Sequence, residues 1–258
     1  MELIVLGTGA AYPGPRQACS GYLVRDGQTG LLLDCGNGIV SRLQEAGEMD
    51  NLTAIIFSHL HADHLLDIFP LFYSRAYARG KSYPRLPVYL PPGETDRFVR
   101  IAEVLRVEPK KLFERTFDVT EYEPYSGLKI DSLHISFASN EHPIPTYAIR
   151  IDDGGSSIIY SSDTGPSPAL EQLARGSHLA LFEATLAGSD YNPVNPIHLT
   201  PSLAAEIAAK AAVKKLLLTH IWPFYDRSAM LAAAQRVFQP TELAEELKLY
   251  RCTNNNQE

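Results

Sequence analysis

Apolar residues follow two spacings along the chain, and each spacing predicts one kind of element. Runs that are short and apolar, or that alternate with polar residues, predict β-strands at residues 2–7, 20–25, 30–34, 53–57, 132–138, 145–151, 156–161, 178–182, 214–219 and 246–250. Apolar residues three or four apart predict helices at residues 38–47, 64–79, 94–106, 167–175, 201–212 and 227–238. Because several strands follow one another without a helix between them, we expect an α/β fold in which two mixed sheets pack together, covered by helices.

Length and composition indicate one folded domain. The chain has 258 residues, of which 45% are hydrophobic and 21% charged, a balance typical of a globular protein with a substantial core. No linker rich in Pro, Gly or Ser interrupts the sequence. We therefore expect a single domain over residues 1–252 and a polar tail at residues 253–258.

Charge, cysteine content and the N-terminal residues bear on partners and location. The formal charge of −7 and the pI near 5.6 argue against broad electrostatic capture of nucleic acid. The three cysteines lie far apart and predict neither a disulfide framework nor a thiolate metal cluster. Met1 leads directly into a short apolar run, and no apolar stretch is long enough to span a bilayer. We expect a cytoplasmic protein with no membrane partner.

The strongest chemical signal is a cluster of four metal-binding side chains within six residues. It follows the strand predicted at residues 53–57 and consists of His59, His61, Asp63 and His64. Side chains two apart in an extended chain point the same way, so His59 and His61 can hold one metal, while the other two turn toward a second. Imidazole and carboxylate are the ligands that borderline divalent metals prefer. The alternative is a run of histidines with no ligand role.

Three further candidate ligands stand at the ends of later strands: His142, Asp163 and His220. The ends of these strands can converge on one edge of a sandwich. Taken alone, each residue has a simpler interpretation, as a loop contact, part of an ordinary turn and a satisfied core histidine, respectively.

Together these residues resemble the metallo-β-lactamase superfamily. The resemblance rests on the pattern His-x-His-x-Asp-His, a later His, an Asp in Ser162-Asp163-Thr164 and a final His after an apolar strand, and it covers nearly the whole chain from Gly7 to His220. It implies a four-layer αββα sandwich with two mixed β-sheets flanked by helices. It also implies two divalent metal ions, with zinc expected first and manganese or iron as alternatives.

The resemblance implies a role for each candidate ligand. One metal ion would be held by His59, His61 and His142. The other would be held by Asp63, His64 and His220. Asp163 would bridge the two ions, together with a hydroxide.

Two more positions resemble the ribonuclease Z and phosphodiesterase branch of the superfamily. They are Glu183 in Phe182-Glu-Ala-Thr185 and His198 in His198-Leu-Thr200. The implied roles are stabilisation or protonation of the leaving oxygen by His198 and orientation of that ring by Glu183. The alternative is a histidine before a helix and a glutamate at a strand end. Asp34 resembles the family's carboxylate that supports the metal-bound histidines, although a plain strand-end turn is nearly as good an interpretation.

The sequence departs from ribonuclease Z in one segment. Residues 147–160 predict a plain hairpin with its turn at Asp152-Asp-Gly-Gly155, where ribonuclease Z enzymes of this type carry a long arm for tRNA. The chain is similar instead to atypical cyclic-nucleotide phosphodiesterases, which share the segments Ser58–His64 and Leu216–Ile221.

Three other segments have two interpretations each. Gly7-Thr-Gly9 resembles part of a dinucleotide fingerprint, but Tyr12 occupies the place of its third glycine, which favours a tight loop near the active site. The helix at Leu65–Tyr77 is apolar over much of its circumference, which fits a homodimer surface, a substrate wall or ordinary core packing. The basic residues Arg75, Arg79, Lys81 and Arg85 form either a local nucleic-acid patch or a solvated helix end.

The expected reaction is hydrolysis of a small phosphodiester, with a cyclic nucleotide as the first choice. A bridging hydroxide would attack phosphorus while Asp63 holds the nucleophile and His198 assists the leaving group. Aromatic side chains would stack on the base, namely Tyr12 and either Phe224 or Tyr225. The alternatives are a hydrolase of lactones or thioesters, a ribonuclease Z-like tRNA 3′-processing endonuclease, redox chemistry at iron, and a binding protein without catalysis.

Overall fold

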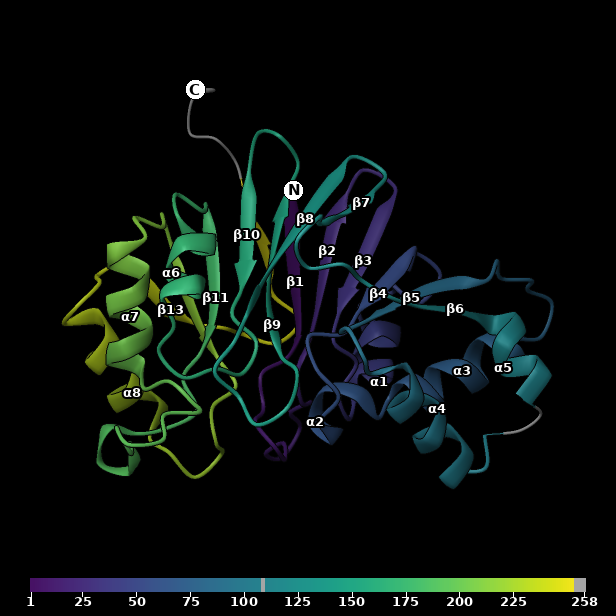
Figure 1. The fold of residues 1–258 in the computed structure, drawn as a ribbon, viewed down its shortest axis with the longest axis horizontal. Helices are drawn as coiled ribbons and strands as arrows, with labels where there is room; N and C mark the ends of the chain where they lie inside the picture. Colours follow the sequence, from purple (N-terminus) through teal and green to yellow (C-terminus); the bar gives the residue numbers. More distant parts are fainter. Residues whose placement is uncertain (108–109, 253–258) are drawn as a thin grey trace.

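Two mixed β-sheets form the centre of the molecule (Figure 1). The computed structural model describes residues 1–107 and 110–252. Within these residues the first sheet has the strand order β14 (Leu249–Arg251), β1 (Glu2–Gly7), β2 (Gly21–Asp26), β3 (Thr29–Leu33), β4 (Ala54–Ile56), β5 (Leu86–Leu90) and β6 (Phe117–Glu121). The second has the order β13 (Thr241–Leu243), β12 (Leu216–Thr219), β11 (Leu179–Glu183), β10 (Ser157–Tyr160), β9 (Tyr147–Asp152), β8 (Leu133–Ser139) and β7 (Leu128–Ile130).

The central strands of each sheet are buried on both faces, so successive side chains serve different cores. Leu3 and Val5 of β1 lie in the core between the two sheets, whereas Ile4 and Leu6 lie in the core beneath the helices of the first sheet. In the second sheet, Leu217 of β12 faces the core between the sheets and its neighbours face the helices on the other side. A period of two along strands that are apolar throughout therefore produces a layered molecule.

Helices cover the outer face of each sheet. The first sheet is covered by α1 (Ile39–Glu45), α3 (Ile68–Ala76), α4 (Thr95–Val104) and α5 (Lys110–Thr116). The second is covered by α6 (Pro168–Ala174), α7 (Pro201–Lys210) and α8 (Arg227–Gln235). Figure 1 shows the two groups of helices on opposite sides of the paired sheets, which confirms the predicted αββα sandwich.

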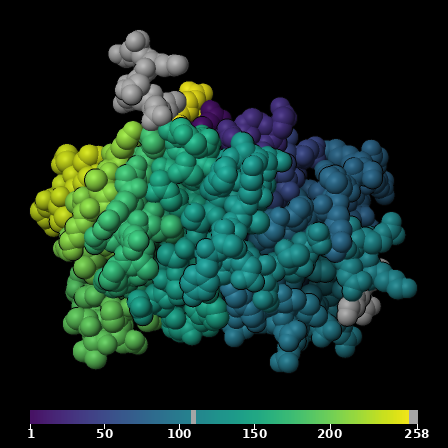
Figure 2. All heavy atoms as spheres, turned by 45° about the horizontal axis from the view of Figure 1, so that its top comes forward, coloured from purple at the N-terminus to yellow at the C-terminus, as the bar shows by residue number. Residues whose placement is uncertain are grey.

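The two ends of the described chain lie side by side. Strand β14 pairs antiparallel with β1, with Glu2 opposite Arg251. In Figure 2 the yellow residues near the C-terminus border the purple residues near the N-terminus.

The single domain stays a prediction, and the predicted polar tail lies outside the described residues. Among the described residues, none of the helices has both the length and the apolar character needed to cross a bilayer. The cytoplasmic location stays a prediction.

The helix predicted at residues 64–79 is wrong as one element, because the chain forms α2 (Ala62–Leu65) and then α3. Pro70 has no N–H to donate to the Leu66 carbonyl, and its ring excludes a regular turn before it. The carboxylate of Asp67, at the break, accepts a hydrogen bond from the Val40 N–H at 2.9 Å.

Tyr73 and Tyr77 at the end of α3 are exposed and stack on each other. The homodimer through this helix stays a prediction.

The pattern missed β5, β6, β7, β13 and α5. Pro87 lies inside β5, where proline argues against a strand, and β6 has the partly exposed sequence Phe-Asp-Val-Thr-Glu. Strands β7 and β13 are three residues each, too short to carry a periodic signal. The predicted hairpin is confirmed: β9 and β10 pair antiparallel from Asp152 and Ser157, joined by residues 153–156.

The carboxyl ends of the central strands lie at one edge of the sandwich. Strands β3 and β4 are parallel, and so are β10, β11 and β12. The hydroxyl of Tyr160, the last residue of β10, donates to Asp34 Oδ2, just after β3, at 2.8 Å. The strand ends of the two sheets therefore face each other, and residues that follow these strands can meet.

Candidate metal centre

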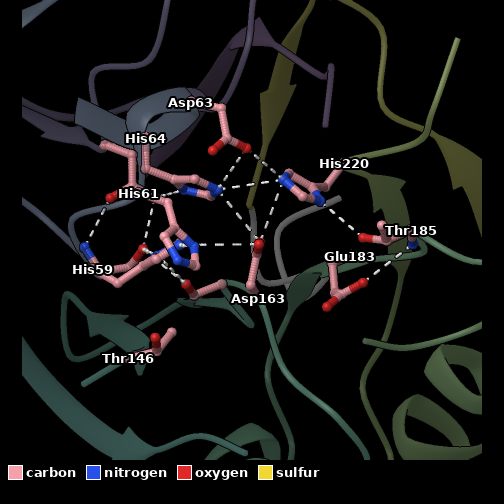
Figure 3. Close-up of polar contacts among 12 residues, drawn as sticks. His59, His61, Asp63, His64, Thr146, Asp163, Glu183, Thr185 and His220 are labelled. Carbon is pink, nitrogen blue, oxygen red and sulfur yellow. Dashed lines mark hydrogen bonds and ion pairs between the residues drawn. The ribbon is translucent and has the colours of Figure 1, made fainter. Parts of the chain in front are cut away.

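Seven side chains that the sequence singled out meet at this edge. They form two groups in which the ligand atoms lie within 4.8 Å of one another: His59, His61, His142 and Asp163 in one, and Asp63, His64 and His220 in the other. Figure 3 shows six of these residues directed toward one another, namely His59, His61, Asp63, His64, Asp163 and His220. The structure therefore brings together all seven predicted ligands, and each group could hold a metal ion.

The first group has the spacing of a tetrahedral site. His61 Nδ1 lies 3.1 Å from His59 Nε2 and 3.2 Å from His142 Nε2. Ligands bound at the usual zinc to nitrogen distance in a tetrahedron are separated by about 3.3 Å. The three nitrogens are thus already spaced as ligands of one ion.

The second group has the same spacing. His220 Nε2 lies 3.3 Å from His64 Nε2 and 3.1 Å from Asp63 Oδ2. The Asp63 carboxylate and the His64 ring belong to α2, the short helix that follows the first two histidines. The strand-to-helix turn therefore divides four neighbouring residues between two sites, as the extended spacing predicted.

Asp163 lies between the two groups. Its Oδ2 is 3.9 Å from His59 Nε2, and its Oδ1 is 3.4 Å from His64 Nε2 and 3.5 Å from His220 Nε2. Oδ1 is buried and has no hydrogen-bond partner among the described residues. A buried carboxylate oxygen without a donor is costly unless a cation satisfies it, so this atom fits a metal ion.

Four of the five histidines in the two groups are oriented through the nitrogen that faces away from the centre. His59 Nδ1 is 3.1 Å from Ser58 Oγ, and His64 Nδ1 is 2.8 Å from Asp34 Oδ2. His142 Nδ1 is 3.3 Å from the Ile197 carbonyl, and His220 Nδ1 is 2.8 Å from Thr185 Oγ1. A proton on each Nδ1 satisfies these acceptors and leaves the Nε2 lone pair directed into the centre.

Asp34 supports both groups at once. This fully buried carboxylate accepts hydrogen bonds from the Ser58 N–H at 2.7 Å, the Ser58 hydroxyl at 2.8 Å and the Tyr160 hydroxyl at 2.8 Å, in addition to its contact with His64. Because Ser58 Oγ also contacts His59, one carboxylate orients a histidine of each group. The plain strand-end turn considered for Asp34 does not describe these contacts.

Three strand-end residues at the centre have left-handed backbones. The φ angles of Asp34, Ser162 and His220 are 56°, 55° and 54°, a region that non-glycine residues seldom occupy. Each residue directly follows a strand or lies next to a ligand. Such strain persists where surrounding contacts impose it, and it is concentrated at functional sites.

Burial and neighbouring charges set the protonation states. Burial lowers the pKa of His59, His61 and His142, which favours the neutral rings. Burial raises the pKa of Asp63, but the adjacent His64 and His220 outweigh it and hold that pKa below its usual range. Neutral imidazoles and ionised carboxylates are the forms in which these groups bind metals.

His198 and Glu183 form a pair beside the second group. His198 Nδ1 donates to Glu183 Oε1 at 2.9 Å. His198 also forms a group with Asp163 and His220 whose ligand atoms lie within 4.8 Å of one another. Burial lowers the pKa of His198, but the effect of the Glu183 carboxylate is in the opposite direction and outweighs it. The net result is a pKa raised to about 9. The buried Glu183 also accepts the N–H groups of Thr164 and Thr185, at 2.8 and 3.1 Å, so it ties this histidine to the loop that carries Asp163.

Sequence analysis missed Ser58, Tyr160, Thr185 and Trp222. The first three are polar groups within two residues of a predicted site residue or at the end of a buried strand, and that position is the signal that could have revealed them. Trp222 lies between the predicted ligand His220 and the predicted stacking residue Phe224. Its ring is 5.2 Å from Tyr12 and 5.7 Å from Phe224.

The basic cluster considered for nucleic acid is largely engaged within the protein. Arg75 is buried with its guanidinium over the Tyr83 ring, Lys81 pairs with Asp50, and Arg85 pairs with Asp118. Three of the four basic residues are therefore engaged within the protein, which weakens the interpretation of the cluster as a nucleic-acid patch.

Comparisons with known proteins agree with this geometry. The model of the beta-lactamase superfamily domain matches residues 29–221. An uncharacterized protein of Mycobacterium leprae is 34% identical over 92% of this chain and 84% of its own length. A ribonuclease Z of Brevibacillus brevis is 30% identical over 96% of this chain and 95% of its own.

A solved structure extends the likeness to three dimensions. The probable metallo-hydrolase YhfI of Bacillus subtilis is 28% identical over 92% of this chain and 94% of its own. The crystal structure of YhfI superposes with a TM-score of 0.86, at 26% identity, over 96% of this chain and 98% of that one. The predicted family resemblance and enzyme class are thereby confirmed. The chain belongs to the β-lactamase superfamily, as a metal-dependent hydrolase.

Proposed function

We propose that this hydrolase is a phosphodiesterase that acts on a small phosphodiester, with a cyclic nucleotide as the first choice, and that zinc fills both metal positions. The observation that carries the proposal is the complete set of seven ligand side chains with the His198–Glu183 pair next to it. In this assignment His59, His61 and His142 hold one ion, Asp63, His64 and His220 hold the other, and Asp163 bridges them.

The charge of the centre favours an anionic substrate. Two divalent ions carry more positive charge than Asp63 and Asp163 neutralise, although the chain as a whole has a net charge of −7. A phosphodiester anion would therefore be attracted locally rather than by the protein surface. Bound divalent ions also lower the pKa of water to about 7 and stabilise charge on attacking and leaving oxygens.

The chain's own residues would direct the proton transfers. The oxygen of water forms a bond to phosphorus, and the ester P–O bond on the opposite side breaks. Asp63 accepts a hydrogen bond from the attacking water and holds its orientation. The proton that this water loses passes to solvent, and solvent returns a proton to His198 after each turnover. His198, held by Glu183 through Nδ1, donates a proton from Nε2 to the leaving oxygen, which departs as an alcohol.

A small substrate is favoured over precursor tRNA by the hairpin and the charge. Residues 153–156 are all that joins β9 to β10, so no arm extends there to grip a folded RNA. The acidic surface and the engaged basic cluster offer little counterion release to a large polyanion. A ribonuclease Z-like activity is the second candidate, because the Brevibacillus relative carries that name at 30% identity over nearly the whole chain.

The test is a comparison of substrates under one set of metal and salt conditions. We expect efficient hydrolysis of cyclic AMP and of a nitrophenyl phosphodiester, with little site-specific cleavage of precursor tRNA. Efficient tRNA cleavage with negligible cyclic-nucleotide hydrolysis would contradict the proposed substrate. Turnover confined to a lactone or thioester would contradict the phosphodiesterase assignment altogether.

A further inference from the structure

A row of three aromatic rings lies on the segment that follows the candidate ligand His220 and on the loop attached to it. Tyr12, Trp222 and Phe224 follow one another with ring centroids 5.2 and 5.7 Å apart, and the Trp222 and Phe224 planes are nearly parallel at 21°. Tyr12 is 50% exposed and Phe224 65% exposed, so the row presents aromatic surface to solvent. We call these three residues the aromatic row. Large apolar side chains gathered on a surface commonly mark a binding site.

Backbone contacts fix the aromatic row close to the ligands. Trp222 follows His220 by two residues, which span at most about 7 Å of chain. Gly9 and Ile221 form a parallel bridge, and the Ile221 N–H donates to the Thr8 carbonyl at 3.2 Å. The loop that carries Tyr12 is therefore attached to the segment that carries His220, and both sides of the aromatic row are positioned relative to the metal centre.

Glu246 holds the Tyr12 loop at both ends. Its Oε1 accepts the N–H groups of Thr8 at 3.2 Å and Ala18 at 3.1 Å, and its Oε2 lies 2.9 Å from Arg42 Nη2. A loop fixed in this way loses little conformational entropy when a ligand binds. The aromatic row is thus preorganised rather than assembled by the substrate.

We propose that Trp222, flanked by Tyr12 and Phe224, is the base-stacking wall of this site and selects phosphodiesters that carry a planar purine. This inference rests on the proposed phosphodiesterase function. Aromatic rings stack on the face of a base and tolerate every base, but a larger ring system buries more surface. Purine cyclic nucleotides should therefore bind more tightly than pyrimidine ones, with modest discrimination between adenine and guanine.

The chain contains a built-in probe for this contact, because Trp222 is its only tryptophan. We would titrate the metal-loaded protein with a slowly hydrolysed phosphorothioate analogue of cyclic AMP and record tryptophan fluorescence. Stacking of adenine on the indole predicts saturable quenching. Base-free ribose 3′,5′-cyclic phosphate should leave the emission unchanged at concentrations that inhibit nitrophenyl phosphodiester hydrolysis. Unchanged emission at saturating adenine analogue would overturn the proposal.

Kinetics separate binding from structural damage. Trp222→Ala should raise KM for cyclic AMP by about 10- to 100-fold with little change in kcat, and Trp222→Phe should recover most of the loss. Both variants should hydrolyse base-free ribose 3′,5′-cyclic phosphate as the wild type does. Tyr125→Ala, which alters an exposed tyrosine outside the aromatic row, is the matched control and should change neither substrate.

The outcomes distinguish this inference from the proposed function. An equal loss on both substrates would mean that Trp222 only supports His220, and the stacking role would be wrong. Normal cyclic AMP hydrolysis without quenching would leave the phosphodiesterase in place and remove the stacking wall. Quenching by the adenine analogue in a protein that hydrolyses no phosphodiester would support the stacking wall and contradict the proposed phosphodiesterase function.

Discussion

Histidine side chains at this centre are fixed through one ring nitrogen so that the other can bind. His64 illustrates the arrangement, with Nδ1 2.8 Å from Asp34 Oδ2 and Nε2 3.3 Å from His220 Nε2. A partner on Nδ1 selects the tautomer, fixes the ring plane and increases the basicity of the free nitrogen. The metal affinity of the centre therefore depends on residues that do not bind metal.

Asp34→Asn tests that dependence. Asparagine keeps the shape but replaces one carboxylate oxygen by an amide, so His64, Ser58 and Tyr160 lose a shared acceptor. We expect metal affinity to fall about 10- to 100-fold, measured by competition with a chelator. Asp50→Asn, at an exposed ion pair with Lys81, is the control and should bind metal as the wild type does. Unaltered affinity in Asp34→Asn would mean that the carboxylate serves only the fold.

His198→Ala tests the assignment of this histidine to the leaving group. The variant should retain its metals and lose on the order of 10²–10⁴-fold in kcat on cyclic AMP, the usual contribution of a positioned acid. Nitrophenolate departs without a proton, so a nitrophenyl phosphodiester should suffer less. His134→Ala, at an exposed position on β8, should have no effect on either substrate. Loss of a metal ion from His198→Ala would make the residue a ligand instead.

Elements were predictable from sequence where the pattern was local. The buried strands before His59, Asp163 and His220 have continuous apolar runs, so the pattern could place these candidate ligands near strand ends. The assignment of Asp163 and His220 to metal positions came from the family resemblance. The contacts that orient the ligands were not predictable, because they cross between the sheets. Tyr160, for instance, contacts Asp34 across 126 positions of sequence. Such pairs depend on tertiary packing, which neither periodicity nor a motif encodes.

The loop that carries His198 depends on one close approach between backbones. A Cβ on Gly165 would lie 1.7 Å from the Pro196 carbonyl oxygen, so this loop packs directly on the glycine. Gly165→Ala should push residues 196–198 away from the centre and reduce kcat by about 10²-fold, because small displacements of catalytic groups are costly. Steady-state kinetics on the folded variant provides the measurement.

Gly188→Ala is the matched control in the same loop. A Cβ at Gly188 would meet no atom within 4 Å, and we expect activity close to that of the wild type. Equal activity of the Gly165 and Gly188 variants would show that the position of this loop does not limit catalysis.

At the scale of the whole molecule, the centre joins the two sheets. Asp34 and the residues of the first motif follow β3 and β4, whereas Asp163 and His220 follow strands of the second sheet. Buried carboxylates and imidazoles gathered without a cation carry a desolvation cost that bound metals would offset. Metal binding should therefore stabilise the packing of one sheet on the other.

Chelation tests this link between metal and stability. A ligand at 100 times its Kd that binds only the folded state contributes about 2.7 kcal/mol, and a domain of this size gains about 2–4 °C per kcal/mol. We expect removal of metal to lower Tm by about 5–10 °C and added zinc to restore it, measured by thermal unfolding. Asp163→Ala should show a smaller difference in Tm between the metal-loaded and the metal-free protein. An identical Tm with and without metal would contradict the claim that metal binding stabilises the packing of the two sheets.

Metal content tests the central claim most directly. Elemental analysis of the untagged protein after gentle purification should find about two divalent ions per chain, because both groups of ligands are complete. Zinc is the ion we expect to predominate. A content well below one ion per chain, which added metal fails to raise and which brings no gain in hydrolysis, would contradict the account.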